Sequence, residues 1–264
     1  MNEPILSSRQ FPHLAHWAAL GLALLLGGCG ASSTPTRPGK EKDAAAYNVQ
    51  LGIAYLNQGD IALAKDKLDR ALKEDPGSPD VHSARAMLFA RMALPDQADG
   101  EYRSALRLAP HDPNVVNNYA VYLCQHGRVE DGVRRFEEAA HNALYRTPEA
   151  AYTNAGVCLR QAKRDDEARA DFARALQIKP NFAEAAFQLT SLQFQHGELA
   201  PARAGIDAFV GSFDATADLL LLGVRVARAQ GDKIAAQRYG RRLQLDFPGS
   251  EQARALAELD RNPG

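Results

Sequence analysis

The sequence has almost no net charge, few aromatic residues and no long apolar run. Its 264 residues include 31 lysines and arginines against 32 aspartates and glutamates, which gives a formal net charge of −1. Nucleic-acid-binding proteins carry a basic patch or stripe, so this balance gives no electrostatic case for a nucleic-acid partner. Aromatic residues make up only 7%, alanine is abundant, and no segment shows the alternation of β-branched residues expected of strands. An all-α fold with closely approaching helices is therefore expected.

Catalytic and metal-binding motifs are also missing. The sequence has no Gly-x-x-x-x-Gly-Lys loop, no His-Glu-x-x-His and no Gly-x-Ser-x-Gly. A metal site needs several ligands within bonding reach. The histidines beyond the N-terminal leader are instead scattered among polar neighbours and expected helix ends: His82, His111, His126, His141 and His196. The sequence predicts no catalytic residue, no metal, no cofactor and no small-molecule substrate.

The N-terminal apolar run is too short to span a membrane. It extends from Trp17 to Gly28, whereas a membrane-spanning helix needs about 20 apolar residues. It fits the apolar segment of a secretory signal peptide. Its end, Leu26-Gly27-Gly28-Cys29, resembles the bacterial lipobox, in which the cysteine sulfur takes a diacylglycerol and the chain is cut before it. Residues 1–28 are therefore expected to be a lipoprotein signal peptide and Cys29 the acylated N-terminus; a plain secretory signal with a chance cysteine is the alternative.

A polar tether is expected behind the anchor, over residues 29–43. From residue 30 it reads GASSTPTRPGKEKD, and proline, serine, glycine and charge bury little apolar area. By resemblance to proteobacterial lipoproteins, an aspartate directly after the cysteine favours retention in the inner membrane. Gly30 stands there instead. The expected location is therefore the periplasmic face of the outer membrane, with the lipid as the anchor.

Residues 44–264 contain a sequence repeat in one continuous register. Four sets of equivalent positions each advance by 34, 34, 36, 34 and 33 residues. A 34-residue helix–turn–helix unit is the tetratricopeptide repeat. The sets are Gly52, Ala86, Ala120, Gly156, Thr190 and Gly223; Ala64, Ala98, Gly132, Ala168, Ala202 and Ala235; Leu68, Tyr102, Phe136, Phe172, Ile206 and Tyr239; and Ala71, Ala105, Ala139, Ala175, Phe209 and Arg242.

The residue types in these sets explain how each unit folds. The small residues of the first two sets let the two helices of a unit cross closely, and the large residues of the third set fill the space beside the crossing. Glycine accepts a positive φ at little cost, which suits it to the turns at Gly59, Gly127, Gly197 and Gly231. Pro76, Pro110 and Pro180 mark the ends of three second helices.

The repeats and the end of the chain together predict the architecture. Pro148 suits the first turn of a helix, so residues 141–147, which include Tyr145, are expected to form an irregular loop. Ser250 is expected to cap a last helix that carries Ala253, Leu256 and Leu259. The predicted fold is a right-handed α-solenoid of about six tetratricopeptide repeats with a C-terminal capping helix.

Two cysteines lie at nearly equivalent positions on the first helices of the third and fourth units, Cys124 and Cys158. Helix axes pack about 8–10 Å apart, which brings facing Cα atoms near the distance that a disulfide needs. The periplasm is oxidising. From the residues alone, a disulfide and two separate buried thiols are equally compatible with the sequence.

The chain resembles the type IV pilus biogenesis and stability lipoproteins (PilF/PilW) over roughly residues 45–250. The most specific stretches are "NNYAVYLCQHGRVEDGVRRFEEAAHNALYRTPEAAYTNAGVCL" and "LLLGVRVARAQGDKIAAQRYGRRLQLDFPGS". Ala120 stands where members often have glycine. The resemblance implies a Cys124–Cys158 bridge and a pilotin function: an outer-membrane lipoprotein that helps the pilus secretin reach the membrane and assemble into its ring.

A partner-binding groove is predicted on the first helices, at positions not used in the crossing. The first unit offers Val49, Ile53, Leu56 and Asn57 at helical spacing, and the third unit offers Asn117, Val121 and Gln125. The alternative is that Ile53 and Leu56 pack the edge of the stack or meet the tether. Two other functions stay open: a tethered scaffold for outer-membrane barrel assembly or cell-wall synthesis, and an enzyme that uses the groove.

Overall fold

The computed structural model describes residues 38–261, which contain thirteen α-helices and no strand. Cys29, the expected signal peptide and most of the expected tether lie outside this range. In chain order the helices are α1 (Pro38–Gln58), α2 (Ile61–Glu74), α3 (Pro79–Arg91), α4 (Pro95–Leu108), α5 (Pro113–Gln125), α6 (Val129–Ala140), α7 (Pro148–Gln161), α8 (Asp165–Ile178), α9 (Ala183–Gln195), α10 (Leu199–Ser212), α11 (Ala217–Ala229), α12 (Lys233–Asp246) and α13 (Glu251–Arg261).

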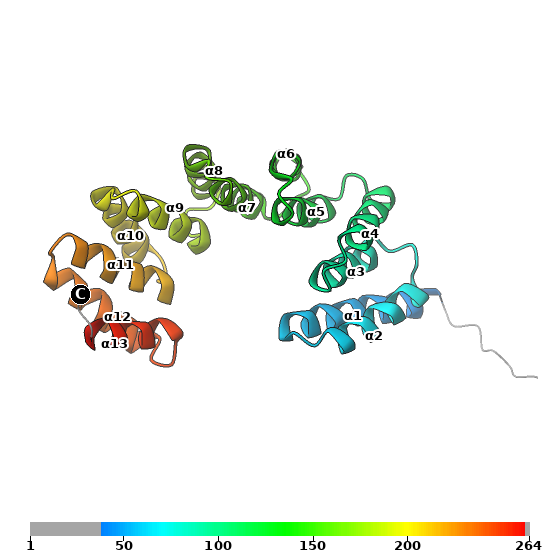
Figure 1. The fold of residues 1–264 in the computed structure, drawn as a ribbon, viewed down its shortest axis with the longest axis horizontal. Helices are drawn as coiled ribbons and strands as arrows, with labels where there is room; N and C mark the ends of the chain where they lie inside the picture. Colours follow the sequence, from blue (N-terminus) through cyan, green and yellow to red (C-terminus); the bar gives the residue numbers. More distant parts are fainter. Residues whose placement is uncertain (1–37, 262–264) are drawn as a thin grey trace, which may run out of the picture. The chain divides into compact units, whose positions relative to one another are not determined.

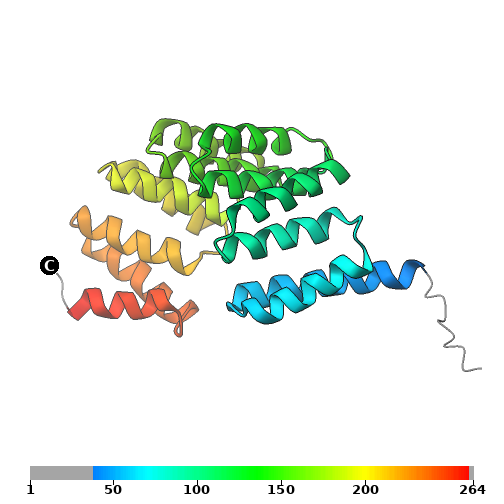
Figure 2. The same ribbon diagram turned by 45° about the vertical axis from the view of Figure 1, so that its right-hand side comes forward.

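The first twelve helices form six helical hairpins that follow one another in chain order (Figures 1 and 2). Each first helix packs against its own second helix and against the first helix of the next unit. Among the described residues, the backbones of consecutive second helices do not approach one another closely. The six first helices, α1, α3, α5, α7, α9 and α11, therefore form one continuous layer, called here the first-helix layer. α13 packs against α11 and α12, where a seventh first helix would lie.

The helix crossings confirm the predicted register. All six residues of the first set are buried, as are all six of the second and third sets. A Cβ atom added to Gly52 would lie 2.6 Å from Leu68 Cγ, and one added to Gly156 would lie 2.5 Å from Phe172 Cε1. The same crossing in the last unit places Gly223 against Tyr239. Small residues on the first helix and large residues on the second therefore pack against each other directly within these units.

The turn inside each unit has a residue in the left-handed conformation at the same position, whether or not that residue is glycine. Gly59, Gly127, Gly197 and Gly231 have φ angles between +74° and +80°. In the second and fourth units the equivalent residues are Ala93 (φ 56°) and Lys163 (φ 61°). The sequence analysis identified the four glycines and missed these two positions, because neither residue type marks a left-handed turn.

The helices begin and end near the prolines and the serine from which these positions were predicted. α2, α4 and α8 end two residues before Pro76, Pro110 and Pro180. α7 begins at Pro148 after the irregular segment 141–147. Ser250 Oγ accepts a hydrogen bond of 3.0 Å from the Ala253 N–H at the start of α13.

The expected tether requires one correction at its C-terminal end. α1 begins at Pro38, so residues 38–43, which were assigned to an extended tether, form the first turns of a helix. Proline suits the first helical position because the missing N–H would have no partner there. The lysines and Glu41 that follow are good helix formers. Their side chains remain exposed. The charged residues therefore predicted the exposure of this segment correctly, but they did not predict its helical backbone.

Candidate functional site

A set of side-chain amides recurs on the first-helix layer at one position of the repeat. Two residues before the small residue of each crossing stand Gln50, Asn118, Asn154 and Gln188, in the first, third, fourth and fifth units. We call these four residues the amide column. All four are exposed or half-buried. Each amide offers two N–H donors and a carbonyl acceptor, the groups that the backbone of a bound peptide needs.

Two members of the amide column, Asn154 and Gln188, each form a hydrogen bond with a residue of the neighbouring first helix. Asn154 Nδ2 donates to Asn117 Oδ1 at 3.3 Å, which joins α7 to α5. Arg160 Nη1 donates to Gln188 Oε1 at 2.6 Å, and Gln188 Nε2 donates to Glu184 Oε1 at 2.7 Å. These bonds orient the amides across three units. The surface is therefore a polar, partly preorganised strip.

A small hollow lies between α1 and α3, next to this strip. Its volume is about 210 Å³, and Val49, Gln50 and Ile53 of α1 face Ser83, Ala84 and Met87 of α3 across it, with Asn118 of α5 at its edge. The Ser83 side chain is only 5% exposed. Its Oγ has no hydrogen-bond partner within residues 38–261. A buried hydroxyl without a partner costs free energy. The hollow therefore combines apolar side chains and one unsatisfied hydroxyl with the charged residues Lys42, Asp75 and Asp80, which also line it.

The predicted groove residues of the first unit need a correction. Val49 is 8% exposed and Leu56 is 3% exposed, and both belong to a core cluster with Leu68 and Leu88. They do not face water as the groove prediction required, because α3 packs against α1 as well as α2. The sequence argument counted only the crossing within one unit. The alternative, edge packing, is correct for Leu56.

The other predicted residues remain accessible. Ile53 is half-buried, packs against the same cluster and lines the hollow. Asn57 and Gln125 are exposed, and Asn117 and Val121 are half-buried. Asn117 belongs to the hydrogen-bonded strip described above, whereas Val121 packs against the core around Cys158. Partner binding by these residues stays a prediction.

The two cysteines join the first helices of the third and fourth units. Cys124 of α5 and Cys158 of α7 form a disulfide with an S–S distance of 2.02 Å and a Cα–Cα distance of 5.6 Å. The bond crosses the same pair of helices as the Asn154–Asn117 hydrogen bond. Its formation in exported protein stays a prediction, as does lipidation of Cys29, which lies outside the described residues.

Several ion pairs connect one unit to the next. Examples are Arg164 with Glu130 at 2.7 Å and Arg169 with Glu198 at 2.6 Å. Asp171 of α8 differs, because burial raises the pKa of its carboxyl to about 6, with the negative charge of Glu137 adding to the effect. Asp171 lies on a second helix, away from the amide column. Its pKa therefore bears on stability rather than on the candidate site.

The described range contains neither a cluster of metal ligands nor a membrane-spanning helix. In residues 38–261, no three His, Cys, Asp or Glu side chains converge as metal ligands would. No helix in that range combines the length and the apolar character needed to cross a membrane.

Five residues of the candidate site were not predicted from the sequence: Gln50, Ser83, Asn118, Asn154 and Gln188. The amide column was detectable, since its members are spaced like the crossing residues that defined the repeat. Comparing exposed positions between units, rather than buried ones alone, would have found it. Ser83 carried no such signal, because the lack of a partner for its hydroxyl depends on how α1 and α3 pack.

The chain is similar to tetratricopeptide-repeat proteins of type IV pilus assembly. A tetratricopeptide-repeat family model matches residues 49–113 and 120–183. The type IV pilus assembly protein PilF of Pseudomonas aeruginosa is 35% identical over 233 residues, which cover 87% of this chain and 92% of PilF.

Solved structures show the same likeness in three dimensions. A structure of Pseudomonas aeruginosa PilF matches with a TM-score of 0.61 and 32% identity, over 83% of this chain and 99% of that one. A crystal structure of PilW, a widely conserved type IV pilus biogenesis factor, matches with a TM-score of 0.62 and 29% identity, over 81% of this chain and 98% of that one. The described fold is thus an all-α solenoid of tetratricopeptide repeats.

Proposed function

Because the chain belongs to the family of the tetratricopeptide-repeat type IV pilus proteins PilF and PilW, we propose that it is a non-enzymatic factor of type IV pilus biogenesis. The observation that carries the proposal is the 35% identity to PilF over 87% of the chain. The finer proposal is a lipoprotein, anchored through Cys29 to the periplasmic face of the outer membrane. There it binds the pilus secretin and promotes its localisation and multimerisation.

The first-helix layer supplies the proposed binding surface. The amide column offers donors and acceptors for a peptide backbone in units one, three, four and five. The α1–α3 hollow offers a pocket for a side chain, with apolar residues on both helices. Peptide recognition commonly combines main-chain hydrogen bonds with side-chain pockets in this way. We place the secretin segment across Gln50 and Asn118, with one apolar side chain in the hollow and a polar atom against Ser83.

Gln50 gives the sharpest test of this surface. Its side chain is exposed and lines the hollow, so Gln50→Arg should leave helicity and melting unchanged. The bulky cation should obstruct the hollow and lower secretin co-purification from detergent-solubilised membranes by about tenfold, equivalent to roughly 1.4 kcal/mol. The matched control is Gln97→Arg, an exposed position on α4. Normal secretin capture by a folded Gln50→Arg protein would place the binding surface elsewhere.

The Ser83→Ala variant distinguishes an effect on stability from an effect on binding. Removing a buried hydroxyl that has no partner should raise the free energy of unfolding of Ser83→Ala by about 1 kcal/mol. The same change should weaken secretin capture if the partner supplies the missing hydrogen bond. Thr153→Val is the contrast, since the Thr153 hydroxyl already donates to the Glu149 carbonyl at 2.7 Å, so this variant should gain no stability.

The anchor is tested on the purified protein. Mass spectrometry should show loss of residues 1–28 together with added acyl mass, and Cys29→Ser should release the protein from the outer membrane. Firm outer-membrane association of the Cys29→Ser protein would rule out lipidation as the anchor. If barrel-assembly or cell-wall synthesis proteins co-purify in place of the secretin, the alternative of a scaffold for another envelope machine replaces the pilus proposal.

A further inference from the structure

One face of each second helix is used to contact the following unit. On α10, Arg203 Nη1 forms an ion pair of 3.3 Å with Asp232, which precedes α12. Asp207 accepts hydrogen bonds from the Tyr239 hydroxyl at 2.5 Å and from Arg238 Nη2 at 2.9 Å. The fifth and sixth units therefore meet through side chains of consecutive second helices.

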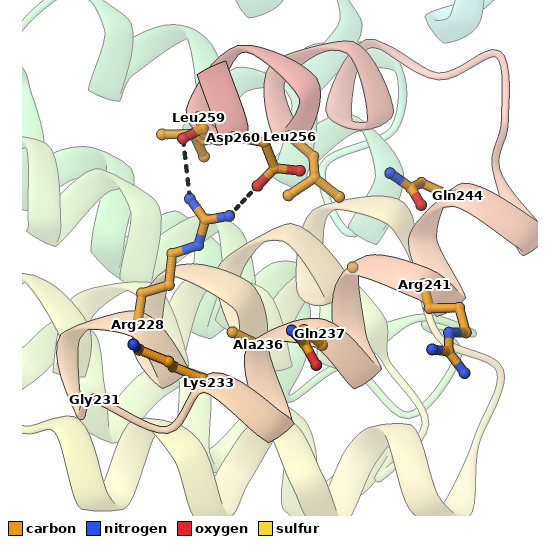
Figure 3. Close-up of a pocket in the computed structure, with 11 residues that line it drawn as sticks. Arg228, Gly231, Lys233, Ala236, Gln237, Arg241, Gln244, Leu256, Leu259 and Asp260 are labelled. Carbon is orange, nitrogen blue, oxygen red and sulfur yellow. Dashed lines mark hydrogen bonds and ion pairs between the residues drawn. The ribbon is translucent and has the colours of Figure 1, made fainter. Parts of the chain in front are cut away.

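The same face of α12 has no second helix to meet. Ala236 and Gly240 stand 33 residues after Arg203 and Asp207, at the equivalent positions of the sixth unit. Beyond them lies only α13. Leu256 of α13 packs on Gly240, and a cavity of about 750 Å³ opens beside Ala236, between α12, α13 and the end of α11 (Figure 3). We call it the C-terminal cavity.

The walls of the cavity are apolar at α13 and cationic at α12. Leu256 is buried and Leu259 is half-buried on the α13 side. Along α12, Lys233, Gln237, Arg241 and Gln244 line the opposite side at helical spacing (Figure 3). Lys233 and Arg241 are exposed and form no ion pair with any other described residue. The cavity therefore carries two free positive charges.

Arg228 at the end of α11 holds α13 in place. Because it pairs with the carboxylate of Asp260, that carboxylate does not neutralise the cations of α12. Its guanidinium forms an ion pair with Asp260 and donates to the Leu259 carbonyl at 3.2 Å (Figure 3). Within residues 38–261, Asp260 is the one carboxylate that lines the cavity, and its charge is already paired with Arg228. No acidic side chain of the cavity wall is left to neutralise Lys233 and Arg241.

Two large aliphatic side chains on α12 also lie exposed next to this wall. Ile234 is 82% exposed and Leu245 is 72% exposed. Their spacing of eleven residues puts them on one side of the helix, adjoining Arg241. A partner helix that enters the cavity and covers Arg241 would remove apolar surface of both residues from water, which favours binding.

We propose that the C-terminal cavity binds an acidic amphipathic helix of a partner protein, in the position that the next second helix would take. The partner helix lies beside Ala236, whose small side chain leaves the cavity open along α12. The apolar side of the partner helix packs on Leu256 and Leu259, and its carboxylates pair with Lys233 and Arg241. This site is separate from the proposed secretin surface and does not depend on the secretin being the partner there.

The test is a binding titration with designed peptides on the protein that carries Cys29→Ser. The probe is a fluorescent 14-residue peptide, the length of α10 and α12, with leucines at three- and four-residue spacing and glutamates elsewhere. Its controls are a scrambled peptide of the same composition and a peptide with lysine in place of every glutamate. The acidic amphipathic peptide should bind at least about tenfold more tightly than either control.

Charge reversal identifies the site. Lys233→Glu/Arg241→Glu should weaken binding of the acidic peptide by about tenfold or more and create binding of the lysine peptide. Lys73→Glu/Arg146→Glu makes the same change in net charge at exposed positions outside the cavity and should change neither affinity. Gln237→Trp closes the cavity without changing charge and should also abolish binding. Circular dichroism melting confirms that each variant is folded.

Three results overturn the proposal. One is equal binding of the acidic and scrambled peptides. The second is an equal loss of affinity in the Lys73→Glu/Arg146→Glu control. The third is a concentration-dependent dimer in sedimentation that Lys233→Glu/Arg241→Glu dissociates, since that result would assign the cavity to a second copy of this chain.

Discussion

At the scale of single residues, the turn inside each unit shows how one backbone requirement is met by different residue types. Four units place glycine at the left-handed position, and two place Ala93 and Lys163 there. The backbone hydrogen bonds are the same: the N–H of Lys163 donates to the Arg160 carbonyl at 3.0 Å, as the N–H of Gly127 donates to the Cys124 carbonyl at 3.1 Å. A side chain with a Cβ is strained in this conformation.

Glycine at these two turns should therefore stabilise the protein. Lys163→Gly and Ala93→Gly each remove a backbone strain of roughly 1–2 kcal/mol from the folded state. Glycine also makes the unfolded chain more flexible, which offsets part of this gain. The free energy of unfolding should therefore rise by about 0.5–1 kcal/mol in each variant. Urea unfolding measures the change. Lys163→Ala keeps the strain and should be neutral, and Gly127→Ala should destabilise. A loss of stability in Lys163→Gly would contradict this account.

Asp171 predicts a pH dependence of stability. Burial raises the pKa of its carboxyl to about 6 from its ordinary value of 3.8, so the folded state binds this proton more tightly than the unfolded state. The free energy of unfolding should then fall as the pH rises from about 4 to about 6. Asp171→Asn removes this dependence and should be more stable than the wild type at pH 7, by about 1 kcal/mol after allowance for partial solvent screening.

The measurement is urea unfolding at pH 4, 5, 6 and 7. The difference between Asp171→Asn and the wild type should disappear near pH 4, where Asp171 is protonated in the folded protein. Glu258→Gln, an exposed position on α13, is the control and should show a pH-independent difference. A constant difference for Asp171→Asn as well would mean that its carboxyl is not perturbed.

Residue-level prediction from sequence worked where the repeat itself supplied the constraint. Gly52, Phe172 and Tyr239 were placed correctly, since a position that recurs in six units is constrained by the crossing that all units share. The expected exposure of Val49 and Leu56 was wrong, because their burial depends on α3 as well as α2. Contacts between units depend on how the helices tilt, and the pattern of a single unit does not contain that information.

At the scale of helices, local signals predicted the starts and ends well but failed at α1. As expected, α7 begins at Pro148 and Ser250 caps the start of α13, because the effects of both residues on the first turn are local. α1 begins at Pro38, earlier than predicted, because the continuing helix beyond Asp43 can extend through exposed lysines and Glu41. Propagation of an existing helix costs much less than nucleation of a new one.

The disulfide between α5 and α7 carries a prediction at this scale. The two cysteines are 34 residues apart, and closing a loop of that length should stabilise the folded protein by about 2–4 kcal/mol. Cys124→Ala/Cys158→Ala should lower the free energy of unfolding by that amount, and dithiothreitol should lower only the wild-type melting temperature. Thiol labelling of unfolded, unreduced Cys29→Ser protein from the periplasm should find no free cysteine. Two labelled thiols would contradict the bridge.

At the scale of the repeat domain, the two proposed binding sites belong to different units of one stack. The α1–α3 hollow is formed by the first three units, and the C-terminal cavity by the sixth unit with α13. In repeat proteins each unit contacts only its neighbours, and stability is close to a sum of local terms. Perturbation of one end should therefore leave binding at the other end unchanged, provided that the intervening units stay folded.

Truncation after Gly249 tests this independence. The truncated chain loses α13 and with it Leu256, which is 2% exposed and belongs to a core cluster with Val224 and Leu243. Loss of that burial should destabilise the sixth unit by about 2–3 kcal/mol. Hydrogen exchange should then accelerate in α11 and α12 but not in α1–α4.

In the same truncated protein, binding of the acidic peptide should disappear, while secretin capture persists. A control truncation after Arg261 should change none of these three measurements. If secretin capture is lost while α1–α4 keep their protection, the secretin surface extends to the C-terminal units, and its placement at Gln50 and the α1–α3 hollow is wrong.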